Sequence, residues 1–142
     1  MSKTGLVIRL VGVIVKTRTT DKDNDMQYML LIYAAENADP KPDTAEFGAM
    51  FQAYMDFNKE TKAAGAHIAG QALQPIPTAT TVRVKDNKTH TSDGPFAETK
   101  EVLGGYYLLD CKDLDEALAW AAKIPTAAWG SIEVRPIMDI GE

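Results

Sequence analysis

The residues best suited to chemistry lie in one short charged segment, residues 93–101 with the sequence DGPFAETKE, which a glycine pair follows closely. Asp-Gly-Pro favours a sharp turn, and we expect the next side chain, Phe96, to be buried and to hold the loop on the core. A loop held in this way would place its charges at the mouth of a cleft, where partly desolvated carboxylates act as acid, base or ligand. The candidate catalytic residues of the loop are Asp93, Glu98 and Lys100.

An ordinary solvated loop is the alternative for this segment. Glu98, Lys100 and Glu101 would then be exposed, with a Lys–Glu ion pair that contributes little to stability. Gly104 and Gly105 would mark a β-bulge or a close approach of two backbones instead of a ligand site. Judged by physical chemistry alone, this second interpretation is favoured.

The histidines and the cysteine add one further candidate. His67 and His90 do not have the spacing of a metal pair, but His67 begins a predicted strand and could reach a cleft as a general base. A surface or half-buried histidine is the alternative. The single cysteine, Cys111, cannot form an intramolecular disulfide, and a cysteine-based metal site needs several thiolates. We therefore expect neither a metal nor another cofactor, and a buried Cys111 that serves as a small apolar side chain.

Charged residues on predicted strands are candidates for ligand contacts. Arg83 and Arg135 occupy polar strand positions that could face a cleft. Solvated strand charges are the alternative, since surface ion pairs are common and contribute little to stability. The candidate ligand-binding residues are Arg83, Gly104, Gly105 and Arg135.

The composition is that of one ordinary domain. The chain has 142 residues, of which 45% are hydrophobic and 25% are charged, and its formal net charge is -5. A chain of this length buries enough surface for a core that needs no metal or disulfide. The acidic balance argues against broad nucleic-acid binding, which depends on clustered Lys and Arg. We expect a cytoplasmic protein that binds neither nucleic acid nor a membrane.

The first 25 residues are expected to form a separate N-terminal extension. Five basic residues oppose three acidic ones there, a net charge of +2, which leaves -7 for residues 26–142. The apolar run of residues 5–15 contains Arg9, is too short to span a membrane and shows no signal-peptide cleavage pattern. Its β-branched residues predict one extra strand over Leu6–Val15, followed by a polar linker. The domain itself would then occupy residues 26–142.

After the extension, apolar periodicity and turn residues predict two helices among the strands. The first helix is expected to carry one apolar stripe, made of Phe47, Met50, Phe51, Tyr54 and Phe57. Helix starts are predicted at Asp43 and Asp113, each followed three residues later by a glutamate. The first helix is expected to end at Gly65 and the second at Pro125. Asp86-Asn87 predicts a tight turn between two strands. The predicted strands are residues 27–33, 67–73, 80–85, 88–92, 103–111 and 132–137.

This order of elements predicts an α+β fold of the ferredoxin-like type, in which both helices cover one face of an antiparallel sheet. The strand of residues 27–33 is apolar on both faces, so the second face must also be covered. A second copy of the chain is the simplest cover. We therefore expect a homodimer in which two sheets pack face to face, which is a dimeric α+β barrel.

Several stretches of the chain resemble the DGPF branch of the YCII-related protein family: residues 93–101 (DGPFAETKE), 104–107 (GGYY), 115–121 (DEALAWA) and 132–136 (IEVRP). The resemblance covers about residues 26–138 and implies a ferredoxin-like dimeric α+β barrel, but no defined reaction. Other YCII-related proteins are thought to use a His-Asp pair with the histidine on the first helix, where this sequence has none. Many members are encoded beside extracytoplasmic-function sigma factors, which implies a bacterial regulatory context.

Two functions of different classes are compatible with these observations. The first is a dimeric small-molecule-binding protein or enzyme with a cleft near the DGPFAETKE loop. The second is a non-catalytic regulatory module that binds a protein partner, such as an extracytoplasmic-function sigma factor, through that loop. A closed pocket lined by the loop side chains would favour the first, and an exposed loop surface would favour the second.

Overall fold

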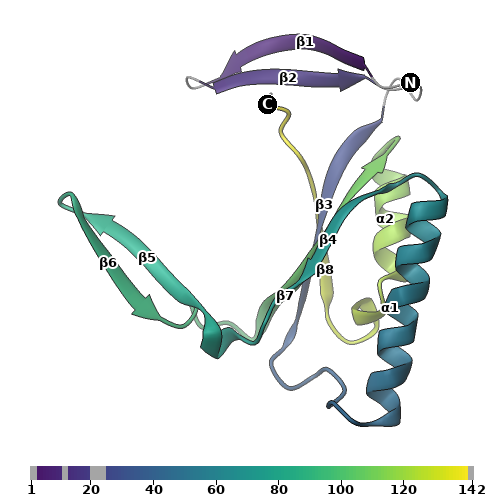
Figure 1. The fold of residues 1–142 in the computed structure, drawn as a ribbon, viewed down its shortest axis with the longest axis vertical. Helices are drawn as coiled ribbons and strands as arrows, with labels where there is room; N and C mark the ends of the chain where they lie inside the picture. The colour runs from purple at the N-terminus through teal and green to yellow at the C-terminus, as the bar shows by residue number, and fades with distance from the viewer. Residues whose placement is uncertain (1–2, 11–12, 20–24, 141–142) are drawn as a thin grey trace.

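The computed structural model describes residues 3–10, 13–19 and 25–140, with side chains described from residue 25 onward. The central sheet consists of β3 (Met26–Ala35), β4 (His67–Ala72), β7 (Glu101–Cys111) and β8 (Ser131–Pro136). These strands are antiparallel in the order β4-β7-β3-β8. Two helices, α1 (Ala45–Ala63) and α2 (Leu114–Lys123), lie on the same face of the sheet (Figure 1). The predicted ferredoxin-like α+β fold is therefore confirmed.

Outside the central sheet, the described part of the chain contains two hairpins and two short 3-10 helices, η1 (Ile76–Thr78) and η2 (Pro125–Ala128). One hairpin pairs β5 (Thr80–Lys85) with β6 (Lys88–Asp93), as the predicted strands 80–85 and 88–92 suggested. The other lies in the N-terminal extension and pairs β1 (Lys3–Leu10) with β2 (Val13–Thr19).

The single strand predicted over Leu6–Val15 is wrong, because Leu10 pairs with Val13 across two antiparallel strands. A hairpin pairs its backbone groups within the extension, whereas a single strand must find the edge of another sheet. Residues 11–12 of the predicted strand and residues 20–24 of the predicted linker lie outside the described residues.

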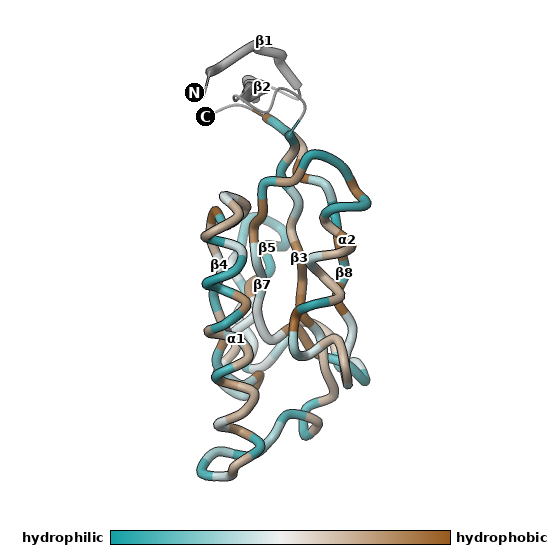
Figure 2. The backbone as a smooth tube through the Cα atoms, turned by 90° about the vertical axis from the view of Figure 1, so that its right-hand side faces the viewer, coloured by the Kyte–Doolittle hydropathy of each residue, from teal (hydrophilic) through white to brown (hydrophobic). Residues whose placement is uncertain are grey.

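Strand β3 is apolar on both faces, as predicted. Its buried side chains Tyr28, Leu30 and Ile32 face the helices, and Figure 2, which views the molecule from the helix side, shows β3 between α1 and α2. The alternate residues are half-buried on the opposite face, which no described helix covers. Cross-strand pairing places side chains of β7 on that same face. We call this surface the open face and define it by Met29, Leu31, Tyr33, Tyr106 and Leu108.

Helix α1 begins one residue later than predicted and ends as predicted. The N-cap is Thr44, whose Oγ1 accepts a hydrogen bond of 3.1 Å from the Phe47 amide, while Asp43 adopts a positive φ of 65°. A hydroxyl caps a helix as well as a carboxylate does, so the neighbouring residue could take this position. At the other end Gly65 has a φ of 74°, and its amide bonds back into the last turn. Glycine adopts this left-handed conformation at no steric cost, which explains the stop.

Helix α2 and the β5–β6 turn form as their local residues predict. Asp113 caps α2 by accepting a hydrogen bond of 2.9 Å from the Glu116 amide, and the Glu116 carboxylate accepts one of 2.8 Å from the Lys112 amide. This reciprocal arrangement is that of a capping box. Asp86 and Asn87 both have positive φ angles, 53° and 63°, as a two-residue type I′ hairpin turn requires.

The core lies between the sheet and the two helices. Phe57 of α1 is its centre on the helix side, with its ring centroid 4.9 Å from that of Tyr107 and 5.9 Å from that of Trp120. Leu30, Leu109 and other buried residues of the sheet surround these rings. Cys111 is fully buried in the same cluster, as expected, and burial raises the pKa of its thiol to about 12.

Candidate functional site

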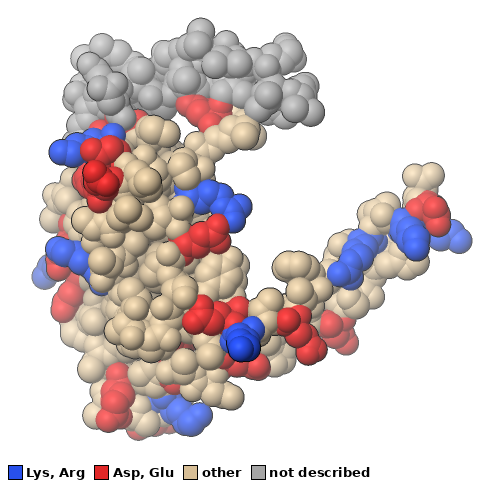
Figure 3. All heavy atoms as spheres, turned by 180° about the vertical axis from the view of Figure 1, so that it is seen from behind, with Lys and Arg blue, Asp and Glu red and all other residues tan. Residues whose placement is uncertain are grey.

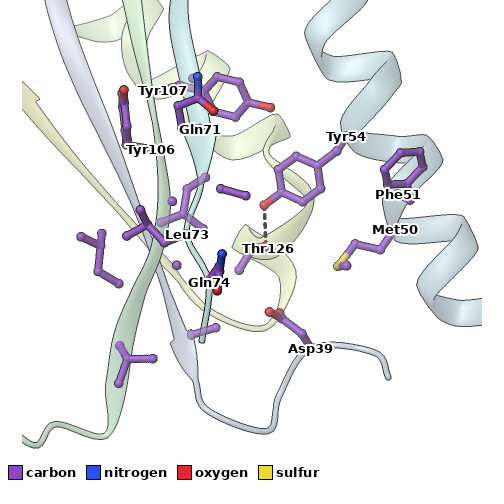
Figure 4. Close-up of a pocket in the computed structure, with 18 of the residues that line it drawn as sticks. Asp39, Met50, Phe51, Tyr54, Gln71, Leu73, Gln74, Tyr106, Tyr107 and Thr126 are labelled. Carbon is purple, nitrogen blue, oxygen red and sulfur yellow. Dashed lines mark hydrogen bonds between the residues drawn. The ribbon is translucent and has the colours of Figure 1, made fainter. Parts of the chain in front are cut away.

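A cavity of about 750 Å³ lies between α1 and the sheet, beside the core (Figure 4). The helix side of the lining comes from the first half of α1, where the sequence predicted an apolar stripe. The sheet side comes from the ends of β3, β4 and β7 that lie opposite. The helix residues concerned are Phe47, Met50, Phe51, Tyr54 and Met55.

Small residues on the strands explain why this space is open. Only Phe57 of the predicted stripe reaches the fully buried core, whereas Phe51 is 59% exposed at the cavity. The sheet residues opposite these large side chains are alanines and glycines. Their small side chains leave a space between the helix and the strands. These residues are Ala34, Ala35, Gly70, Ala72, Gly104 and Gly105.

Two tyrosine hydroxyls lie in the space between helix and sheet, each with its own hydrogen-bond partner. The Tyr54 hydroxyl of α1 lies 2.6 Å from Oγ1 of the buried Thr126, and Tyr107 of β7 donates a hydrogen bond of 2.5 Å to Oδ1 of Asn58 (Figure 4 shows both rings). Burial raises the pKa of Tyr54, and it raises the pKa of Tyr107 to about 12. Both groups are therefore neutral hydroxyls at physiological pH, able to donate and to accept hydrogen bonds.

His67, the predicted general base, lies at the start of β4 and lines this cavity. Its ring is half-buried, with its centroid 6.1 Å from that of Tyr107 in an edge-to-face arrangement. Burial lowers the pKa of His67, and the ammonium group of Lys62 lowers it further. The imidazole is consequently neutral at pH 7, and a neutral imidazole has one nitrogen that accepts a proton or a hydrogen bond.

A side-chain amide and a carboxylate complete the polar part of the lining. Gln74 comes from the segment after β4, and Asp39 lies in the loop before α1, whereas the side chain of Gln71 shares the open face with Tyr106. The Asp39 carboxylate accepts a hydrogen bond of 2.7 Å from the indole of Trp129, which holds it at that end of the cavity. A mostly apolar space with a few convergent polar groups is the usual form of a small-molecule site.

Three of the eight residues predicted from the sequence come together here: His67, Gly104 and Gly105. Gly104 lies at a shift in the β3–β7 register, because Ile32 pairs with Gly105 and Tyr33 pairs with Leu103. The two glycines therefore form the bulge that the sequence offered as one interpretation, and they also line the cavity.

The other five predicted residues do not line this cavity. Asp93, Glu98 and Lys100 are exposed on the loop that follows β6. Arg83 lies on β5, where its guanidinium donates a long hydrogen bond of 3.4 Å to the Phe96 carbonyl oxygen. Arg135 lies on β8, and its Nε donates a hydrogen bond of 2.9 Å to the Glu133 carboxylate. Their part in ligand binding or catalysis stays a prediction.

The expectation that Phe96 is buried is wrong, because its side chain is 78% exposed. Polar contacts to β5 hold the loop instead. Thr81 Oγ1 donates a hydrogen bond of 2.8 Å to the Gly94 carbonyl oxygen, and Arg83 reaches the carbonyl of Phe96 itself. The loop joins the end of β6 to the start of β7, and along it the ring of Phe96 points into solvent.

Reasoning from the sequence missed Asn58, Tyr54, Tyr107 and Thr126. Three of them occupy elements that were expected to pack as core or to form a simple strand. The available signal was the contrast between large side chains on one face of a helix and glycines or alanines on the strands opposite. Nothing in a single sequence shows that these two sets face each other.

Within residues 25–140, no cluster of three or more histidine, cysteine, aspartate or glutamate side chains has the arrangement of a metal site. The helices of the described chain are also too short or too polar to cross a membrane.

An antiparallel four-stranded sheet with two helices on one face, and a cavity beneath one of them, places the protein among the ferredoxin-like α+β proteins. Residues 26–141 match the family model of the YCII-related domain, so the chain belongs to the YCII-related family. An uncharacterized protein of Rhizobium meliloti (strain 1021) is 51% identical over 67 residues, which are 46% of this chain. The matched stretch spans 54% of that relative.

Proposed function

We propose that the protein binds a small molecule in the cavity between α1 and the sheet. The volume of about 750 Å³ is the observation that carries this proposal, because ligand sites commonly occupy roughly 300–1,000 Å³. The apolar lining favours a ligand with a hydrophobic body. The hydroxyls of Tyr54 and Tyr107 and the neutral ring of His67 favour one that carries a hydrogen-bonding oxygen or nitrogen.

The same lining limits the chemistry that the cavity supports. Among the described residues that line it there is no serine or cysteine. Cys111 lies in the core with a pKa of about 12, so it is a poor nucleophile. His67 is the lining residue best suited to accept a proton at neutral pH. Binding, or proton transfer through His67, is therefore favoured over covalent catalysis.

The proposal includes a homodimer formed through the open face. Its side chains are apolar and only half-buried, as Leu31, Tyr33 and Leu108 show. This supports a second apolar surface that packs on the open face. A second copy of the chain offers an identical apolar face, and most soluble oligomers pair like surfaces in this way. The cytoplasmic location expected from the sequence is part of the same proposal.

Titration with 8-anilinonaphthalene-1-sulfonate, a fluorescent apolar probe, tests the cavity. Ala72 lines the cavity on β4 beside Gly105, so Ala72→Phe should fill it and weaken probe binding by at least about tenfold. Ala119→Phe is the matched control, because Ala119 is exposed on α2 outside the lining. Equal affinities of the two variants would contradict the proposal.

A second candidate function is that of a regulatory module which binds a protein partner through the 93–101 loop. The exposed ring of Phe96, on a loop that also carries Asp93, Glu98 and Lys100, favours it, because solvent-exposed aromatic residues commonly serve as contact points between proteins. The partner to test is a purified extracytoplasmic-function sigma factor, the partner class that the family resemblance implies.

Two exposed phenylalanines separate these functions. Phe96→Ala should weaken sigma-factor binding by at least about tenfold if the loop is the contact, and it should leave probe binding unchanged. Phe51→Ala, at the mouth of the cavity, should show the opposite pattern. No sigma-factor binding by the wild-type protein would exclude this partner, and a loss of probe binding in Phe96→Ala would contradict the cavity assignment.

A further inference from the structure

The hairpin of β5 and β6 projects from the body of the molecule, and none of the other described strands pairs with it (Figure 1). We call it the arm and define it as Thr80–Asp93. Figure 3 shows the arm separated from the body by a wide hollow. A two-stranded hairpin alone in water is marginally stable, so an arm of this kind needs a surface to pack on.

The two faces of the arm differ in chemistry. Val82 lies opposite Thr91 and Val84 lies opposite Thr89, so these four β-branched side chains share one face, which ends at the pair of Thr80 and Asp93. We call it the β-branched face. Both valines are well exposed, Val82 at 59% and Val84 at 69%. The opposite face carries the basic side chains and a histidine: Arg83, Lys85, Lys88 and His90.

The charge of the arm is opposite to that of the rest of the domain. Residues 80–93 hold three basic and two acidic residues, a net charge of +1. Residues 26–79 and 94–142 hold seven basic and fifteen acidic residues, a net charge of -8. The opposite net charges therefore attract the arm toward another copy of this chain at long range, before any surface makes contact.

We propose that the arm docks on a second copy of the chain, with its β-branched face against the partner. This inference rests on the proposed homodimer and adds a second contact to the open face. Because the arm projects beside the open face, a two-fold dimer brings each arm to the other subunit, and both arms make the same contact. Docking removes Val82 and Val84 from water and covers a hairpin that would otherwise stand alone.

Two double variants with the same change in charge test the docking face. Val82→Asp/Val84→Asp places two carboxylates on the β-branched face, and His90→Asp/Ser92→Asp places two on the opposite face of the same hairpin. The dimer dissociation constant is measured by light scattering over a dilution series. The first variant should raise it by at least about 100-fold, and the control by less than about tenfold, because only the first buries its carboxylates on docking.

Two other results would separate a failure of the homodimer from a failure of the arm contact. A wild-type mass of 15.5 kDa, the mass of one chain, would overturn the homodimer and with it the docking of the arm on a second copy. A dimeric wild type with equal dissociation constants for both variants would overturn the docking of the arm alone, and the dimer through the open face would stand.

Thiol reactivity tests the same contact without adding charge. Val84 and His90 are both exposed in the single chain, whereas the native Cys111 is fully buried. In the dimer, Val84→Cys should react with a thiol reagent at least about tenfold more slowly than His90→Cys, because docking shields position 84. Equal reaction rates in a dimeric protein would overturn the inference.

Discussion

Neighbouring glycines at positions 104 and 105 show how strongly the role of a residue depends on its surroundings. Gly105 is buried where β7 passes close to β4, and a Cβ placed on it would lie 2.8 Å from the Gln71 carbonyl oxygen. Gly104 occupies the bulge, and the nearest atom to a Cβ there would be 4.0 Å away. The close approach of the β4 backbone therefore requires glycine at position 105, whereas position 104 has room for a side chain.

Alanine at these two positions should therefore have different effects. Gly105→Ala forces the β4 and β7 backbones apart and should lower the free energy of unfolding by about 1–3 kcal/mol. Gly104→Ala should change it by less than about 1 kcal/mol. Urea denaturation of both variants measures the difference, and a Gly104→Ala loss as large as that of Gly105→Ala would contradict the packing described.

The stability of the protein should depend on pH through His67. Burial and Lys62 lower the pKa of His67 in the folded chain below its ordinary 6.5, so the unfolded chain binds this proton more readily. The stabilising contribution is complete above pH 6.5 and is lost as the pH falls toward the folded pKa. Between about pH 7.5 and about pH 5.5, Tm should fall further in the wild type than in His67→Gln.

His90→Gln, on the exposed arm, is the control for this measurement and should follow the wild type. If the wild type and His67→Gln lose the same number of degrees, His67 does not have the environment that the structure gives it.

At the scale of elements, α1 has two functions along its length. Its second half carries Phe57, which packs on Tyr107 and Trp120, and Thr61, whose buried hydroxyl donates a hydrogen bond of 3.0 Å to the Phe57 carbonyl. Its first half faces the cavity. The apolar stripe predicted from the sequence is thus divided between holding the helix and lining a site.

Two phenylalanines on this helix should separate these functions. Phe57→Ala should lower the free energy of unfolding by about 3–5 kcal/mol, because the ring is almost fully buried. Phe51→Ala should lower it by less than about 1 kcal/mol, because that ring is mostly exposed. Chemical denaturation measures both values, and comparable losses would show that the first half of α1 also packs as core.

At the scale of the whole molecule, the open face and the arm both leave apolar surface exposed to solvent in the single chain. The helices cover one face of β3, and the side chains of the other face stay half-buried. Val82 and Val84 add exposed surface on the arm. These features belong to different elements but share one physical requirement, which is a partner surface that excludes water.

Charge on the open face should separate the subunits of the proposed dimer. Leu31→Glu puts a carboxylate at the centre of β3 and should reduce the mass seen by light scattering at micromolar concentration from about twice 15.5 kDa to that of one chain. Leu118→Glu is the matched control, because Leu118 is exposed on α2 and should leave the mass unchanged. Retention of the dimer mass in Leu31→Glu would exclude the open face as the interface.

The sequence by itself determined the order and most of the bounds of the elements from residue 26 onward. Asp86-Asn87, Gly65 and the Asp113–Glu116 pair act within a few residues of themselves, so their effects follow from local sterics and hydrogen bonds. The double-sided apolar pattern of β3 likewise follows from a period of two residues. The family could also be inferred from the sequence alone, because each motif that carries the resemblance is a continuous stretch of residues. The family model confirms it.

Only the tertiary structure decided where these elements leave space and where they leave side chains exposed. Phe96 is apolar, yet it is exposed because it lies on the connection between the arm and β7, outside the core between the sheet and the helices. Tyr54 and Tyr107 lie 53 positions apart and line the same cavity, because α1 lies over small residues of the central sheet. Burial and cavities are sums over contacts between residues distant in the chain, and local residue preferences do not contain that information.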